Sequence, residues 1–185
     1  QPRMLPKPEA PAPVEVNPQT GVTVYHGTTR EAGDAIRAGG FQPSSGSRNY
    51  GLGSYQATSP ASFFTESRDT AANWARNRAD TGPTDVIEAQ LNLRNPAKLD
   101  ELDDWSSDGW DSIQKIRNRL SPEEWEEFGI DADNLEVINP DRVPLMVDDP
   151  RVVEALQAIG HDGAVFSEGT GSQFGGRSYA VFDRS

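Results

Sequence analysis

The sequence contains no cysteine and only two histidines among its 185 residues. Without cysteine, neither a disulfide framework nor a thiolate metal site can form. No apolar run approaches the roughly 20 residues that span a bilayer, and no basic-then-apolar signal peptide opens the chain. We therefore expect a protein that is stabilised by packing and has no membrane partner.

Common nucleotide and hydrolase motifs are missing as well. The sequence has neither a G-x-x-x-x-G-K-[ST] phosphate loop nor a G-x-S-x-G nucleophile elbow. Asp104, Ser106, Asp108 and Gly109 match the opening of a calcium loop, but Lys115 stands where a bidentate glutamate is required. We expect no metal site.

A net charge of -12 is concentrated in one part of the chain. Residues 100–136 hold thirteen acidic and three basic residues, which leaves a balance of -2 for the rest. A nucleic-acid binder normally carries a basic face, so a protein partner is favoured over a nucleic acid. The acidic segment is either a solvated surface or a surface that binds a partner.

The remaining composition suits one domain with a tether. Six of the fourteen prolines fall within residues 1–20, which predicts an extended tether outside the fold. The chain begins at Gln1 rather than methionine, which favours a processed chain or a piece of something longer. Residues 21–185, with 35% hydrophobic content overall, are expected to form one domain that carries an acidic helical insertion at about 100–136.

Hydrophobic periodicity predicts short strands and helices in the mixed order of an α+β fold. Glycine-rich loops are expected at 41–60 and 167–177. The expected elements are a strand at 22–25, a helix at 30–38 closed by Gly39 and Gly40, a brief strand at 63–64, a helix capped by Ser67 that runs to about 78, a half-buried strand at 85–93, helices at 110–120 and from 122, a helix at 150–158 stopped by Gly160, and strands at 164–166 and 178–182.

His26 is the more suggestive of the two histidines. It leaves a predicted strand within YHGT, where glycine lets a ligand approach the backbone and Thr28 adds a hydroxyl. A histidine at a strand end is either a structural residue or a site residue. For His161, in IGHDG, a turn is a sufficient explanation.

Several blocks together resemble the ADP-ribosyltransferases. The likeness is to the His-Tyr-Glu branch shared with diphtheria toxin and the poly-ADP-ribose polymerases, and more closely to transferase domains of phage and bacterial polyvalent or toxin proteins. It covers residues 22–183 in pieces, outside the tether and the acidic insertion. The blocks are, in order, YHGTT at 25–29, SFFTES at 62–67, AANWA at 71–75, LNLRNP at 91–96, IGHDGAVF at 159–166 and SYAVFD at 178–183.

The resemblance implies a fold of split antiparallel β-sheets around an NAD cleft. His26 would hydrogen-bond a ribose hydroxyl of NAD, and the backbone of Gly27 would bind the nicotinamide carboxamide. Phe63 stands where the family usually has tyrosine and would stack on nicotinamide through its ring face, with Phe64 pointing to the core. The alternative is that both rings simply pack a short strand. Further NAD-binding residues are expected at Thr28 and Tyr50.

Position 178 departs from the family pattern. The family places glutamate or glutamine before the aromatic residue of its last strand, and here Ser178 precedes Tyr179. A glutamate stabilises the positive charge that develops on ribose as nicotinamide departs, whereas serine carries no charge. Either Glu168 substitutes, or the chain binds NAD without turnover, or the serine was introduced to inactivate the protein.

The function implied is a mono-ADP-ribosyltransferase that uses NAD as co-substrate and acts as a toxin or as a phage or bacterial effector. The alternatives are an NAD glycohydrolase and an inactive NAD-binding or interaction module. Phe174 and Arg177 would recognise a macromolecular acceptor, a protein rather than a nucleic acid, and an immunity or other partner protein is a further expectation. The expected location is the cytoplasm, or a target-cell cytoplasm reached as part of a larger protein.

Overall fold

The computed structural model of this chain describes residues 21–41, 61–78, 82–102, 108–127, 143–167 and 176–182. There, one sheet has the strand order β3-β1-β2-β6-β5-β4. Its strands are β1 (Val22–Thr29), β2 (Ala61–Thr65), β3 (Thr84–Leu91), β4 (Pro96–Lys98), β5 (Gly163–Ser167) and β6 (Arg177–Phe182). The helices are α1 (Arg30–Gly39), α2 (Arg68–Arg78), α3 (Asp108–Arg117), α4 (Pro122–Glu127), α5 (Val143–Met146) and α6 (Pro150–Ala158), with a 3-10 turn η1 (Leu99–Glu101). This mixture agrees with the α+β class expected from the sequence.

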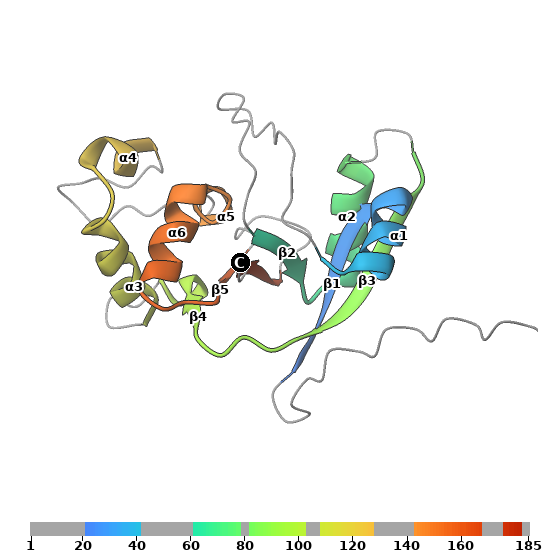
Figure 1. Ribbon diagram of the computed structural model, residues 1–185, viewed down its shortest axis with the longest axis horizontal. Helices are drawn as coiled ribbons and strands as arrows, with labels where there is room; N and C mark the ends of the chain where they lie inside the picture. Colours follow the sequence, from blue (N-terminus) through green and yellow to red (C-terminus); the bar gives the residue numbers. More distant parts are fainter. Residues whose placement is uncertain are drawn as a thin grey trace, which may run out of the picture.

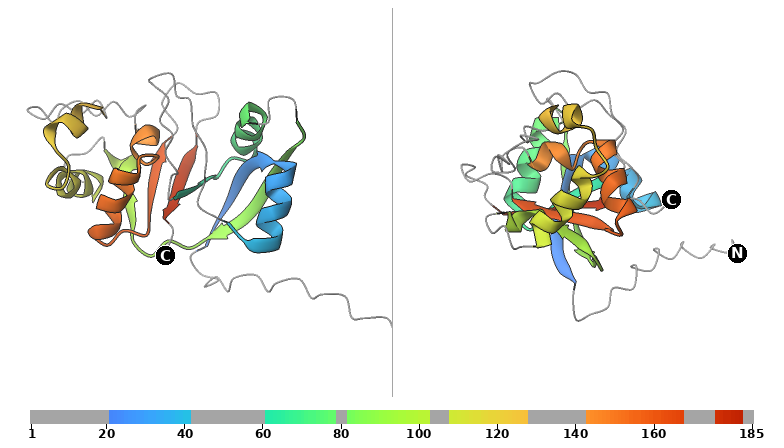
Figure 2. Two further views of the ribbon diagram at one scale, coloured as in Figure 1. Left: turned by 45° about the horizontal axis from the view of Figure 1, so that its top comes forward. Right: turned by 90° about the vertical axis from the view of Figure 1, so that its left-hand side faces the viewer.

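The helices divide between the two ends of the sheet. Figure 1 shows α1 and α2 beside β1 and β3, while α3, α4, α5 and α6 gather near β4 and β5. The left view of Figure 2 shows the same separation, with β5 and β6 between α6 and the β1–β3 end. Within the described ranges, no helix has the length and apolar character needed to cross a membrane.

The sheet has two parts that meet at a single residue pair. β1 pairs with β3 from Val22↔Leu91 to Thr29↔Thr84, and β2 pairs with β6 over its whole length. Between the two parts, β1 and β2 share only the pair Tyr25↔Thr65. Beyond Tyr25, therefore, β1 and β2 separate while each remains paired with its other neighbour.

One strand pair differs from the antiparallel arrangement expected. β4 and β5 run parallel, and parallel neighbours need a long crossover connection. The helices α3 to α6 lie in that connection, which contains the whole acidic segment, residues 100–136. α3 turns Trp110, Ile113 and Ile116 into the core, and its helical spacing is the one predicted. Helix α3 of the acidic segment is therefore packed into the core.

Buried side chains form two clusters. The smaller one joins Val24, Phe64, Val165 and Tyr179, with Phe41 packed against it. The larger one joins β2, β4, β5 and β6 to the crossover helices and consists of Ala61, Phe63, Ala97, Leu99, Leu102, Trp110, Ile113, Ile116, Trp125, Val143, Met146, Val147, Val152, Val153, Ala155, Leu156, Ala164, Phe166, Ala180 and Phe182. Since Phe63 and Phe64 belong to different clusters, β2 contributes to the core on both of its faces.

Capping residues fix the helix ends near the predicted positions. The Ser67 hydroxyl accepts a hydrogen bond from the Thr70 N–H at 3.2 Å ahead of α2. Asp149 accepts from the Arg151 N–H at 2.8 Å at the start of α6. Gly40 ends α1 with φ 79°, the left-handed conformation that glycine tolerates. These three helix boundaries are confirmed.

Two strand boundaries were wrong. β1 runs to Thr29 rather than Tyr25 because β3 pairs with it along its full length, so His26 lies inside a strand and not at its end. The strand expected at 85–93 spans Thr84–Leu91, and Pro96 begins a further strand, β4, that was not expected. Proline is tolerated there because it is the first residue of an edge strand.

Candidate functional site

The candidate site lies where β1 and β2 separate. β1, β2 and β6 are consecutive neighbours in the sheet, and they carry His26, Phe63 and Ser178 respectively. These residues are far apart in the sequence. The structure therefore brings the three strands together, and the positions of the individual side chains show what each can do.

His26 bridges the start of the separation. It follows Tyr25, the last residue of β1 that pairs with β2, and its Nδ1 lies 2.7 Å from the carbonyl oxygen of Phe63. Because a carbonyl only accepts, Nδ1 carries the proton and donates it. In the neutral ring the other nitrogen, Nε2, is then a hydrogen-bond acceptor.

Aromatic rings hold His26 in this orientation. Its ring centroid lies 5.2 Å from that of Phe41, in an edge contact, and 5.7 Å from that of Phe64. Phe41 and Phe64 also meet each other edge to face, with centroids 4.8 Å apart. A hydrogen bond and two ring contacts thus fix a half-buried imidazole, as a site residue requires.

Gly27 has a structural reason to be glycine. A Cβ atom there would lie 1.7 Å from the carbonyl oxygen of Ala71 in α2, so any side chain would collide with the helix backbone. Thr28, the next residue, is buried. The close approach of α2 accounts for the glycine by itself, and the contact between its backbone and nicotinamide stays a prediction.

Phe63 and Phe64 point to opposite faces of β2, as expected of neighbours in a strand. Phe63 lies in the larger cluster, where its ring centroid is 6.5 Å from that of Phe166. Phe64, which was expected to point to the core, is indeed buried, but it is also the ring in contact with His26. Both rings therefore pack in the core, and stacking of Phe63 on nicotinamide stays a prediction.

Ser178 is on β6, next to β2, and its side chain lies on the opposite face of the sheet from His26. Cross-strand partners share a face of a sheet, so the pairs Tyr25↔Thr65 and Thr65↔Ser178 place Ser178 on the face of Tyr25. His26, next to Tyr25, points to the other face. Ser178 has no exposed surface, and among the described residues its hydroxyl has no hydrogen-bond partner.

Polar side chains gather where β2 ends and β6 begins, and two of them, Glu66 and Tyr179, were missed by the sequence reasoning. The Tyr179 hydroxyl donates a short hydrogen bond to Oε1 of Glu66. Burial, reinforced by the bond to Glu66, raises the pKa of Tyr179 to about 12. Glu66 and Tyr179 meet only because of the register in which β2 pairs with β6. No local sequence pattern could therefore have revealed the pair.

Arg177 is part of the same group. Its Nε lies 3.0 Å from Oδ2 of Asp100, and the neighbouring Asp100 charge raises the pKa of the guanidinium. The residue expected to recognise an acceptor is therefore also held by the first residue of the acidic segment. Target recognition by Arg177 stays a prediction.

Other expected site residues lie outside the described residues, namely Tyr50, Glu168 and Phe174. The proposed tether, residues 1–20, lies outside them too. Among the residues that the structure does describe, no group of three or more His, Cys, Asp or Glu side chains is placed to hold a metal ion.

Comparisons with protein-family models, with curated proteins and with solved structures found no match to this chain.

Proposed function

We propose that this chain is an NAD-dependent mono-ADP-ribosyltransferase of the toxin or phage and bacterial effector kind, with a protein as acceptor. One observation carries the proposal. Residues 25–29, 62–65 and 178–182, from the segments YHGTT, SFFTES and SYAVFD that resemble the family's three site-bearing blocks, lie on β1, β2 and β6, adjacent strands at the middle of the sheet. Nothing in their sequence spacing requires that adjacency.

The sheet geometry supports the same proposal. A fold with split sheets around an NAD cleft needs two strand systems that diverge, and here they share only Tyr25↔Thr65. His26 stands at the divergence. With Nδ1 bonded to the Phe63 carbonyl, the neutral ring offers Nε2 to a ribose hydroxyl, which donates to it.

The reaction breaks the bond between the ribose anomeric carbon and the nicotinamide nitrogen. The bonding electron pair leaves with the nitrogen, so nicotinamide becomes neutral and positive charge develops on the ribose. A lone pair of the acceptor then bonds to the anomeric carbon, and the acceptor loses its proton. Preorganised negative charge near the ribose lowers the barrier to the first step.

Ser178 favours a second candidate function, an NAD-binding module without turnover. It occupies the position of the family carboxylate, but it is uncharged and fully buried. A buried serine hydroxyl on the face opposite His26 does not reach a ribose bound beside His26, and a serine cannot offset positive charge. Binding and turnover must therefore be measured separately.

The experiment measures nicotinamide release and NAD affinity for the parent chain, Ser178→Glu and His26→Ala. We expect NAD binding by the parent and a loss of both affinity and release in His26→Ala. Tagged ADP-ribose on a protein identifies a transferase, and free ADP-ribose identifies a glycohydrolase. NAD binding without release in the parent identifies the inactive module.

Because Ser178 is buried, its replacement by glutamate is checked for folding by its unfolding transition before its activity is interpreted. Release that appears only in a folded Ser178→Glu variant would show that this form lacks a working carboxylate. If neither the parent nor folded Ser178→Glu binds NAD or releases nicotinamide, the proposed function is wrong.

A further inference from the structure

We infer that Glu66 supplies the carboxylate that position 178 lacks, by facing the ribose of NAD as nicotinamide departs. The inference rests on the proposed function and adds a residue to it. Glu66 follows β2 directly, and its N–H donates to the carbonyl oxygen of Arg177 at 3.1 Å. That bond continues the pairing of β2 with β6 and sets Glu66 next to Thr65, the cross-strand partner of Ser178.

Glu66 lies on the face of the sheet that carries His26. Side chains alternate along a strand, so Glu66 and Phe64 share a face, and Tyr179 is the cross-strand partner of Phe64. The hydrogen bond from the Tyr179 hydroxyl to Glu66 confirms that these side chains meet. His26 contacts Phe64 on this face, so His26, Phe64, Tyr179 and Glu66 all lie on one face of the sheet.

Among the described residues, Arg177 and Tyr179 are the groups that act on the charge of Glu66. Arg177 is the nearby cation; its guanidinium is paired with Asp100 at 3.0 Å, and its attraction to Glu66 raises its pKa less than the Asp100 charge does. Tyr179 is neutral at physiological pH, as an ordinary tyrosine is, and it donates to one carboxylate oxygen of Glu66. Glu66 itself is exposed, so its negative charge is accessible to a ligand. The hydrogen bond from Tyr179 orients the carboxylate.

This arrangement provides what the first step of the reaction needs. As the electron pair leaves with the nicotinamide nitrogen, the ribose becomes positive and the Glu66 carboxylate stabilises that charge. Glu66 forms no bond to the ribose and takes up no proton in this step. Tyr179 is a positioning residue, since it acts on the ribose only through Glu66.

The test compares nicotinamide release by the parent, Glu66→Gln and the control Glu154→Gln, with NAD affinity and the unfolding midpoint measured for each. Glutamine keeps an oxygen that accepts from Tyr179, so the variant removes charge and little else. Glu154 is an exposed glutamate on α6, far along the chain from the site. We expect Glu66→Gln to lower release about 100-fold, with affinity and midpoint unchanged, and Glu154→Gln to match the parent.

A second pair of variants tests the charge argument. Asp100→Asn removes the main partner of Arg177, whose attraction to Glu66 is then no longer shared with Asp100, so release weakens. Adding Arg177→Gln to Asp100→Asn removes that competing cation, so release recovers. A merely structural role for Glu66 would not produce this recovery.

Three results separate this inference from the proposed function. Unchanged release in Glu66→Gln overturns the inference and leaves the transferase proposal standing. Release by folded Ser178→Glu but not by the parent also overturns it, because Glu66 is then present and insufficient. Absence of NAD binding and release in both forms overturns the proposed function, and the inference with it.

Discussion

Gly27 of β1 and Ala71 of α2 approach so closely that a Cβ atom on Gly27 would lie 1.7 Å from the Ala71 carbonyl oxygen. The same hypothetical atom would lie 2.6 Å from the Ala71 carbonyl carbon. These contacts are with helix backbone, which cannot move aside as a flexible side chain can. Gly27 therefore fixes the distance between α2 and the strand that carries His26.

Replacement of Gly27 by alanine is expected to destabilise the protein. The helix must shift to admit the methyl group, and overpacking of this kind typically costs about 1–3 kcal/mol. Gly39, at the end of α1, is the matched control, since a Cβ atom there would have no neighbour within 4 Å. Urea unfolding should show a lower free energy of unfolding for Gly27→Ala and a change of at most about 1 kcal/mol for Gly39→Ala. Equal stability of the two variants would contradict the close packing.

Local sequence signals predicted the helices well because each signal acts within a few residues. Ser67 and Asp149 cap helices through their own side chains, and Gly40 takes a left-handed conformation. The apolar spacing of Trp110, Ile113 and Ile116 likewise requires only that α3 has one face against the core. None of these features depends on what the rest of the chain does.

The separation of β1 from β2 could not be predicted in this way, since pairing decides it. His26 was placed at a strand end because the apolar run stops at Tyr25, whereas β3 extends the strand to Thr29. The bond between Tyr179 and Glu66 joins residues 113 apart in the sequence. Its existence depends on the register of β2 with β6, which a sequence pattern does not encode.

His161 shows how a local explanation can be correct and still incomplete. It follows Gly160, whose φ of 99° marks the turn that was predicted. Its ring also joins distant segments, with Nδ1 2.9 Å from the carbonyl oxygen of Asn95 and Nε2 3.0 Å from the Ser112 hydroxyl. The ring thus connects α3 to the segment between β3 and β4, for which the sequence offered no signal.

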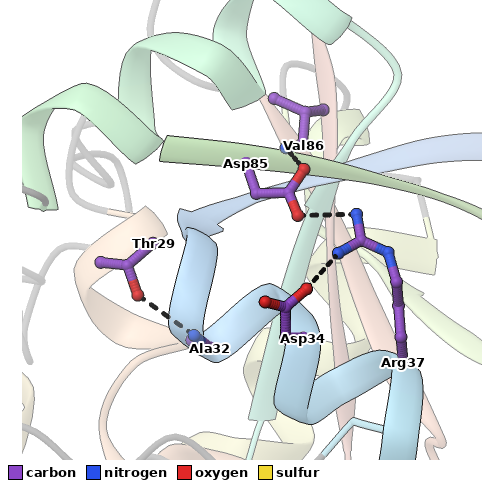
Figure 3. Close-up of polar contacts among 6 residues, drawn as sticks. All are labelled: Thr29, Ala32, Asp34, Arg37, Asp85 and Val86. Carbon is purple, nitrogen blue, oxygen red and sulfur yellow. Dashed lines mark hydrogen bonds and ion pairs between the residues drawn. The ribbon is translucent and has the colours of Figure 1, made fainter. Parts of the chain in front are cut away.

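The carboxylate of Asp85 anchors α1 to β3 (Figure 3). Its Oδ2 lies 2.6 Å from an amino group of Arg37, and its Oδ1 accepts from the Val86 N–H at 2.8 Å. The hydrogen bond from Arg37 lowers the pKa of Asp85 below its ordinary value of 3.8, although partial burial opposes the shift. A lowered pKa in the folded state stabilises the fold at any pH above the unfolded value and ceases to do so as pH falls through the folded value.

Asp85→Asn is therefore expected to lower the free energy of unfolding at neutral pH by up to about 1 kcal/mol, since Arg37 is half exposed. Asparagine still accepts from Val86, so the change isolates the ion pair. The difference from the parent should shrink as pH falls below about 3.8 and vanish once Asp85 is protonated in the folded state. Asp34→Asn is the control, because that carboxylate, also bonded to Arg37, is 72% exposed and is expected to contribute little. A difference for Asp85→Asn that persists in acid would contradict the assignment to the ion pair.

The Tyr179 hydroxyl should titrate later than an ordinary tyrosine. Burial is the main cause and the bond to Glu66 adds to it, which together raise the pKa from about 10 to about 12. Because the pKa of Tyr179 is raised in the folded state, the protonated hydroxyl contributes its full stabilisation below the unfolded pKa. That stabilisation is lost as pH rises through the folded pKa. Tyrosinate absorbance, read as the difference between the parent and Tyr179→Phe, should isolate a transition near pH 12.

The same titration distinguishes the two causes of the shift. In Glu66→Gln the burial of Tyr179 remains but the negative charge beside its hydroxyl is gone, so the midpoint should fall while staying above the ordinary value. Glu154→Gln should leave it unchanged, since that residue lies on the exposed face of α6. A midpoint in Glu66→Gln equal to that of the parent would mean that burial alone holds the proton on Tyr179. The carboxylate of Glu66 would then not be oriented by this hydroxyl, and the positioning role of Tyr179 would be wrong.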